Sequence, residues 1–189
     1  MTPFTTLTAY AARLDRANVD TDQIIPARFL RKPRSAGYGN FLFHDLPEVR
    51  QAMQGAAILL AGPNFGCGSS REGAVYALVD AGIRCVVAPG FGDIFAGNAG
   101  KNGLLTVVLP ASAICGLHGD VTVDLPAQRI QAGPADLAFE IDQFRKRCLV
   151  EGLDDIGLTL AYADAIRAWT AADAARRPWA TPHSGGTGP

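Results

Sequence analysis

The chain has 189 residues, a length that suits one domain of ordinary size followed by a tail. Apolar residues make up 48% of it and charged residues 19%, so the chain has enough apolar surface to bury a core. The net charge of −1 argues against broad attraction to nucleic acid or to an anionic membrane. No apolar run is long enough to span a bilayer and the first residues do not resemble a targeting segment, so a cytoplasmic protein is expected.

The first half of the chain predicts strands that alternate with helices. Apolar runs predict strands at residues 4–14, 56–61, 85–88 and 104–109, and helices are expected at 72–81 and 91–98. This order indicates a parallel α/β organisation. Residues 31–40 are basic and contain glycines, which predicts a loop that acts as a mobile lid or as an interface.

The second half changes character. Val121, Val123 and Leu125 alternate with polar neighbours, which predicts an antiparallel hairpin that returns at residues 137–141. Helices are expected at 154–160 and 164–175. Residues 178–189 are rich in Gly, Pro, Ser and Thr and are expected to form a disordered tail. The sequence therefore predicts one α/β domain over residues 1–177, with a mixed parallel and antiparallel sheet.

The cysteines predict no metal centre. Cys67, Cys85, Cys115 and Cys148 form no C-x-x-C pair, and their spacing fits neither a zinc ribbon nor a ferredoxin cluster. We expect reduced thiols and no metal or cofactor bound by this chain, with Cys85 and Cys148 buried. Cys67 is the exception, because it lies in a glycine-rich loop.

That loop, residues 62–72 with the sequence GPNFGCGSSRE, joins a predicted buried strand to a predicted helix. Glycines such as Gly68 let the backbone bend sharply and approach a ligand closely. The start of a helix offers free N–H groups and a positive dipole end, both of which favour an anion. Arg71 adds a permanently charged guanidinium suited to a carboxylate, and Ser69 and Ser70 lie beside it. The loop therefore predicts a site for a carboxylate-bearing ligand.

The same residues also have a purely structural interpretation. Ser69 and Glu72 have the S-x-x-E spacing of a capping box, in which Ser69 would only cap the helix. The loop lacks the lysine of a phosphate-binding Walker motif and the order of a nucleophile elbow. Asp20 and Asp22 are either site residues or solvated acids in a turn. Spacing alone leaves these alternatives open.

Residues 18–26, NVDTDQIIP, followed by residues 64–72, NFGCGSSRE, resemble the aconitase superfamily. Within it the chain resembles the small subunits of 3-isopropylmalate dehydratases over about residues 4–170. Further stretches that share the likeness are 88–95, 101–105, 139–142 and 152–160. Several separate motifs in the same order carry this resemblance.

The resemblance implies a swivelling β/β/α fold and the interconversion of 2-isopropylmalate and 3-isopropylmalate through isopropylmaleate, in leucine biosynthesis. It implies a separate large subunit that holds a [4Fe–4S] cluster and without which the chain is inactive. By match to the motif, Ser69 would be the general base, and Arg71 would hold a substrate carboxylate with help from Ser70. Asp20 and Asp22 would line or brace the site. A serine is a poor base in water, so it would need Arg71, backbone N–H groups and a dry site.

Several positions depart from the family pattern. Gly73 stands where histidine is usual, Gly90 where serine is usual, and Gly92 where alanine is usual. Residues 35–36 are Ser-Ala where the substrate-recognition loop commonly carries Arg-Thr, and Arg34 is expected to compensate by binding substrate. These departures keep two alternatives open, a related subunit for another hydroxy-dicarboxylate and a non-catalytic module with the same fold.

Overall fold

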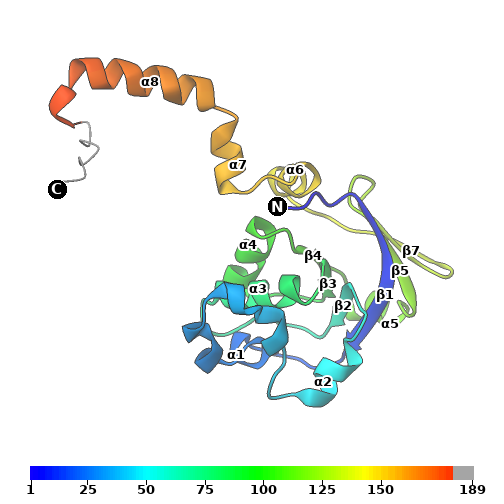
Figure 1. The fold of residues 1–189 in the computed structure, drawn as a ribbon. Helices are drawn as coiled ribbons and strands as arrows, with labels where there is room; N and C mark the ends of the chain where they lie inside the picture. Colours follow the sequence, from blue (N-terminus) through cyan, green and yellow to red (C-terminus); the bar gives the residue numbers. More distant parts are fainter. Residues whose placement is uncertain (181–189) are drawn as a thin grey trace. The chain divides into compact units, whose positions relative to one another are not determined.

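The computed structural model of the chain describes residues 1–180 (Figure 1). Contacts divide the chain into two compact units, Met1–Asp154 and Asp155–Pro189, and each is described by itself. The expected single domain over residues 1–177 stays a prediction. Of the expected tail, Pro178–Ala180 form the short 3-10 helix η4, and residues 181–189 lie outside the described residues.

The first unit is built on a seven-stranded sheet with the order β4-β3-β2-β1-β5-β6-β7. Its strands are β1 (Thr6–Leu14), β2 (Ile58–Ala61), β3 (Cys85–Ala88), β4 (Leu105–Val108), β5 (Asp120–Asp124), β6 (Arg129–Ala132) and β7 (Ala135–Ala138). β1 to β4 pair in parallel, and β1, β5, β6 and β7 pair antiparallel. The mixed α/β sheet predicted from the sequence is confirmed. The expected return strand at 137–141 is wrong in its bounds, because two short strands, β6 and β7, follow β5.

β1 joins the two parts of the sheet because it changes partner halfway along. Its first half runs antiparallel to β5, ending with Tyr10 opposite Asp120. Its second half runs parallel to β2, beginning with Ala11 opposite Ile58. One long strand therefore carries both the parallel part, which leads to the site, and the antiparallel part.

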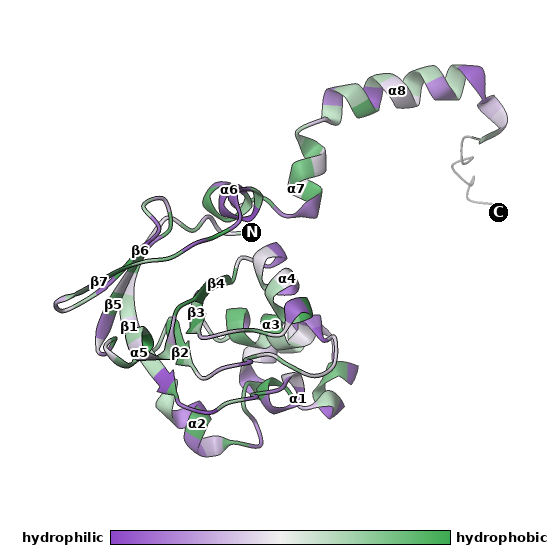
Figure 2. Ribbon diagram, turned by 180° about the vertical axis from the view of Figure 1, so that it is seen from behind, coloured by the Kyte–Doolittle hydropathy of each residue, from purple (hydrophilic) through white to green (hydrophobic). Residues whose placement is uncertain are grey.

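β2 and β3 are buried along their whole length, as expected of central parallel strands with continuous apolar sequences. Alternate residues point to opposite faces, so the apolar residues separate into two cores, one on each face. Figure 2 shows the hydrophobic colouring of these central strands. Because both faces of these strands are buried, a ligand in this part of the molecule must bind at the loops that follow them.

Helices cover the parallel part of the sheet. They are α1 (Thr21–Ile24), α2 (Pro47–Ala52), α3 (Glu72–Asp80), α4 (Asp93–Lys101) and α5 (Ala111–Cys115), with α6 (Gln143–Glu151) after the antiparallel part. Three 3-10 helices, η1 (Ala27–Arg31), η2 (Arg34–Ala36) and η3 (Tyr38–Phe41), make up the expected basic loop. The loops that leave β1, β2 and β3 lead to α1, α3 and α4, so the starts of these helices gather at the carboxyl edge of the parallel strands, where ligands bind in open α/β sheets.

The second unit contains α7 (Asp155–Leu160) and α8 (Ala163–Arg176), and none of its described residues is buried. Trp169 on α8 is 61% exposed. The charges of α8 pair along the helix itself, with Asp173 bound to both Arg176 and Arg177. Within residues 1–180, no helix is long and apolar enough to cross a membrane.

Candidate active site

A pocket of about 250 Å³ lies at the carboxyl edge of the parallel strands. Thr21 of α1, residues 66–69 of the loop after β2, Arg71 before α3 and residues 92–95 at the start of α4 line it. The structure therefore brings three predicted site residues, Gly68, Ser69 and Arg71, to one cavity. Ser70 is exposed between two of them and does not line it.

Parallel pairing continues past the ends of β1, β2 and β3 and holds the pocket together. Asp20 pairs with Cys67, and Phe65 pairs with Phe91, as isolated parallel bridges. The Phe65 N–H donates to the Gly90 carbonyl at 3.1 Å, and the Gly92 N–H donates to the Phe65 carbonyl at 2.9 Å. The three loops therefore form a short extension of the sheet in the same strand order.

Glycine is required where these loops turn. Gly66 and Gly68 have φ of +73° and +87°, in the left-handed region that side chains disfavour. A Cβ on Gly66 would lie 2.2 Å from the ring of Phe95. The loop carrying Ser69 can take this path only because both residues lack side chains.

The capping-box interpretation of Ser69 and Glu72 is wrong. The N-cap of α3 is Arg71, and no side chain caps it. Glu72 instead accepts a hydrogen bond from Asn102 Nδ2 at 2.7 Å. Ser69 lies two residues before the N-cap, at the pocket, so its hydroxyl is not committed to the helix.

The capping box belongs to α1 and uses Asp20. The Asp20 carboxylate accepts from the Gln23 N–H at 2.7 Å, and the Gln23 side chain accepts from the Asp20 N–H at 3.0 Å. Asp20 therefore braces the turn that carries the other acidic residue, Asp22. A direct contact of Asp20 with substrate stays a prediction.

Asp22 holds the guanidinium of Arg71. Asp22 Oδ1 accepts a hydrogen bond from Arg71 Nη1 and another, 2.8 Å long, from the Ala27 N–H. The bond from Arg71 and then the bond from Ala27 hold the pKa of the Asp22 carboxyl below its usual range, so it is ionised at neutral pH. A guanidinium has five N–H donors in a planar fork, so Arg71 keeps donors for a second carboxylate.

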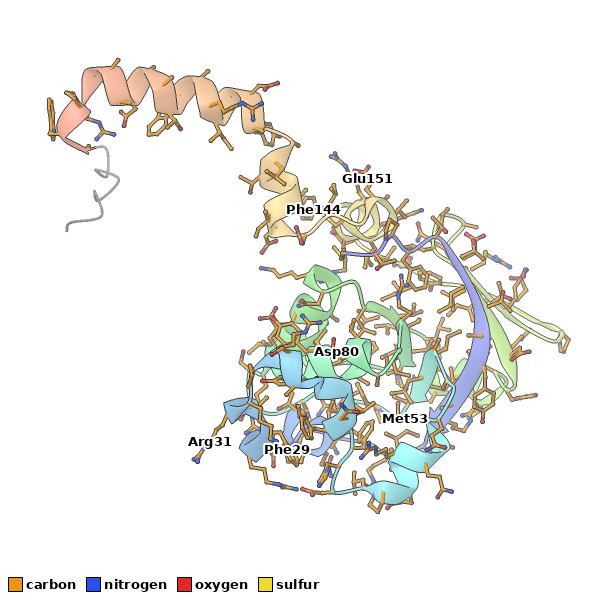
Figure 3. All side chains as sticks on the ribbon, in the orientation of Figure 1. Phe29, Arg31, Met53, Asp80, Phe144 and Glu151 are labelled. Carbon is orange, nitrogen blue, oxygen red and sulfur yellow. The ribbon has the colours of Figure 1, made fainter. Side chains whose placement is uncertain are left out.

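Arg34 lies elsewhere. Its Nη2 donates to Asp80 Oδ1 at 2.8 Å, and its guanidinium lies 4.0 Å from the ring centre of Tyr76. Both partners belong to α3, so Arg34 fastens the segment of η1 to η3 to this helix and does not line the pocket. Figure 3 shows Asp80 on α3 and Arg31 pointing outward from η1. A role of Arg34 in binding substrate stays a prediction.

Two of the three glycines that depart from the family pattern have local packing reasons. A Cβ on Gly73 would lie 2.5 Å from Leu30 of η1, so this segment packs where a side chain would stand. A Cβ on Gly92 would lie 2.6 Å from the backbone oxygen of Gly66. Around Gly90 no atom lies within 4 Å of such a Cβ. Gly92 is therefore tied to a close approach at the pocket, and Gly73 to the packing of η1 against α3.

Sequence reasoning missed Thr21 as well as the lining residues Asp93, Ile94 and Phe95. Asp93, Ile94 and Phe95 follow β3, just as the loop with Ser69 follows β2. Because β2 and β3 are adjacent and parallel, the two loops leave the sheet at the same edge. The predicted strand order could therefore have placed these three residues near Ser69. Thr21 lies in the motif of residues 18–26, but its contact with the distant serine loop could not be read from that motif.

The burial predicted for Cys85 and Cys148 is confirmed. This burial raises the pKa of the Cys85 thiol. Cys67 is partly buried at the pocket and Cys115 is exposed. Within the described part of the chain, no three His, Cys, Asp or Glu side chains are grouped so that they could hold a metal ion.

Comparisons with known proteins match this architecture. The family model described as aconitase C-terminal domain matches residues 43–112, and the model for the C-terminal domain of the 3-isopropylmalate dehydratase small subunit matches residues 155–182. The 3-isopropylmalate dehydratase small subunit of Magnetococcus marinus is 45% identical over 95% of this chain and 99% of its own. That of Xanthobacter autotrophicus is 46% identical over 95% of this chain and 100% of its own.

A solved structure supports the same relationship. The 3-isopropylmalate dehydratase (leuD) of Methanocaldococcus jannaschii superposes with a TM-score of 0.71 and 27% identity, covering 87% of this chain and 99% of that one. Fold and site thus define a swivelling domain of the aconitase C-terminal class. The chain belongs to the family of 3-isopropylmalate dehydratase small subunits, which are hydro-lyase subunits.

The packing of Gly92 predicts different costs for two reversions to the family pattern. Gly92→Ala should lower the free energy of unfolding by about 1–3 kcal/mol, because its Cβ meets backbone that cannot move freely. Gly90→Ser, the matched control, should change it by less than about 0.5 kcal/mol. Urea denaturation of the isolated chain measures both. Equal costs for the two variants would contradict the close approach at Gly92.

The ion pair of Asp22 predicts a titration that depends on Arg71. Carboxyl-carbon NMR should give Asp22 a pKa below its ordinary value of 3.8, because its ionised form is hydrogen-bonded. Arg71→Gln should raise that pKa towards the ordinary value. The pair stabilises the fold above the ordinary pKa, and its contribution is lost as pH falls through the lowered one. If the pKa of Asp22 is the same in the Arg71→Gln variant and in the unsubstituted chain, the ion pair does not form in solution.

Proposed function

We propose that this chain supplies the proton-transfer and carboxylate-binding half of an active site that interconverts 2-isopropylmalate and 3-isopropylmalate through isopropylmaleate. The observation that carries the proposal is that Ser69 and Arg71 share one pocket while Asp22 already orients Arg71. Membership of the small-subunit family supports the choice of reaction. The reaction belongs to leucine biosynthesis, and we place it in the cytoplasm.

The chemistry begins with removal of a proton from the carbon next to a substrate carboxylate. Ser69, present as its alkoxide, takes that proton on Oγ and becomes the neutral hydroxyl. The electron pair left behind forms the double bond as hydroxide leaves the neighbouring carbon. Arg71 holds the carboxylate on which negative charge grows, and charge stabilisation of this kind is worth most in a site that excludes water. The alkene is then hydrated in the opposite sense. The proton adds to the carbon that carried the hydroxyl group, the hydroxide adds to the carbon that lost the proton, and the other isomer results.

The backbone adds to this stabilisation. Ser69 and Ser70 precede the first turn of α3, whose free N–H groups and positive dipole end favour an anion. Ser70 is exposed beside Arg71 and would donate to the same carboxylate. These groups lower the free energy of the serine alkoxide and also that of the negatively charged transition state.

The departing hydroxide needs a Lewis acid, and we place it on the partner subunit. The described residues offer no ligand set for a metal, and the family name of small subunit implies a larger partner. A [4Fe–4S] cluster held by that large subunit would supply the Lewis acid. Because the pocket is open, the partner would cover it and exclude water.

A second substrate class has one observation in its favour. Arg34 contacts Asp80 and Tyr76 on α3, and residues 35–36 lack the arginine that is usual there. A subunit for a hydroxy-dicarboxylate other than isopropylmalate is therefore the alternative. It predicts that the assembled enzyme prefers another malate derivative in a substrate panel.

The direct test is ultraviolet absorbance of the alkene after 3-isopropylmalate is added to this chain and the large subunit prepared without oxygen. Absorbance should rise only when both chains are present. Ser69→Ala should lower turnover by about 10²–10⁴-fold, the usual contribution of a general base. Ser112→Ala, on α5 and exposed, is the matched control and should leave turnover unchanged.

Two outcomes would contradict the proposal. Normal turnover by the Ser69→Ala complex would remove Ser69 from the role of base. Absence of alkene from a formed complex with an intact cluster would reject isopropylmalate as the substrate. A signal from the same complex with another malate derivative would then establish the alternative.

A further inference from the structure

Thr21 is a polar residue hidden from solvent at the pocket. The residue is 3% exposed, and one other polar residue of the described chain, Thr106, is also buried. Burying a hydroxyl is unfavourable unless it is hydrogen-bonded. The Thr21 hydroxyl meets this requirement by donating to the Ser69 carbonyl oxygen at 3.0 Å.

The Thr21 hydroxyl adds a third hydrogen bond between residues 19–21 and residues 66–69. The Gly66 N–H donates to the Val19 carbonyl at 2.7 Å, and the Thr21 N–H donates to the Cys67 carbonyl at 3.0 Å. These two bonds follow the backbone pairing and would form with any residue at position 21 that has an N–H. The bond to Ser69 is different, because it needs a side-chain hydroxyl at that position.

The bond acts where the backbone has little other restraint. Gly66 and Gly68, with positive φ, lie just before Ser69, and the first hydrogen bond of α3 is accepted by the Arg71 carbonyl, two residues further on. Ser69 and Ser70 are both exposed, so packing does not hold them. Fixing the Ser69 peptide fixes the origin of its side chain, and small misplacements of a reacting group are costly in catalysis.

We infer that Thr21 is a positioning residue for Ser69, its buried hydroxyl holding the Ser69 peptide so that the serine side chain faces the pocket. This inference rests on the proposed function, since it assigns a purpose to the orientation of Ser69. Thr21 also lines the pocket beside Ser69, so both ends of the bond lie at the cavity. The requirement is for a hydroxyl on a short side chain at this position.

Thr21→Val tests the inference because it keeps the β-branched shape and replaces the hydroxyl with a methyl group. In the assembled enzyme kcat should fall by about 10- to 100-fold while KM changes little, because Arg71 remains held by Asp22. Thr21→Ser restores the donor and should recover most of kcat. Thr106→Val makes the same chemical change at the other buried threonine, on β4, and should leave kcat unchanged.

Hydrogen exchange gives a readout that does not depend on activity. In the isolated chain, Thr21→Val should speed exchange of the amides of residues 66–71, and Thr21→Ser should not. Unchanged kcat and unchanged exchange in Thr21→Val would overturn the inference. So would equal loss of kcat in Thr21→Val and Thr21→Ser, because that result would assign the effect to packing.

The Ser69→Ala result separates this inference from the proposed function. Lost turnover in Ser69→Ala with normal turnover in Thr21→Val leaves Ser69 as the base and removes the role of Thr21. Normal turnover in Ser69→Ala removes the proposed base. Faster exchange in Thr21→Val would then still establish the restraint on the loop but not its catalytic purpose, and the inference would fall with the function.

Discussion

The site depends on parallel pairing that continues beyond the ends of β1, β2 and β3. Two isolated bridges, Asp20 with Cys67 and Phe65 with Phe91, repeat in the loops the order of the strands that precede them. Because strand order fixes which loops are neighbours, residues far apart in sequence meet at one edge. The pocket is the space between these three joined loops and the helices that they begin.

Close approach is the second requirement of this arrangement. Gly66 allows the ring of Phe95 to lie against the backbone, and Gly92 allows the Gly66 carbonyl to approach. Asp22 then connects Arg71 to the segment that begins at Ala27, through two hydrogen bonds to one carboxylate oxygen. The orientation of the carboxylate-binding group is therefore coupled to the start of the segment of η1 to η3. Arg34, at the start of η2 in the middle of this segment, fastens it to α3.

Much of the parallel half could be predicted from the sequence. The strand at 85–88 is found at those residues, and the helix expected at 72–81 ends one residue earlier, because a continuous apolar run and helical spacing are strong local signals. α6 was missed because its sequence is mostly polar and it buries only Cys148 and Leu149. The turn between β6 and β7 had a signal in Gly133, which has φ of +53°, but a single return strand was predicted instead.

The candidate site was predictable where it is local and unpredictable where it joins distant segments. Gly68, Ser69 and Arg71 are close in sequence, so their common pocket follows from one loop. The hydrogen bond from Thr21 joins residues 48 positions apart and depends on the whole parallel sheet. Arg34 was expected at the substrate, and only the fold shows that Asp80 and Tyr76 engage it.

The central claim is that Ser69 moves the proton next to the substrate carboxylate, and solvent exchange of that proton tests it most directly. Substrate incubated with the assembled enzyme in deuterated water should gain deuterium at the carbon next to the carboxylate, as followed by proton NMR. The Ser69→Ala complex, shown to bind the same substrate, should exchange this proton about 10²–10⁴-fold more slowly. Exchange at the wild-type rate in that complex would contradict the claim.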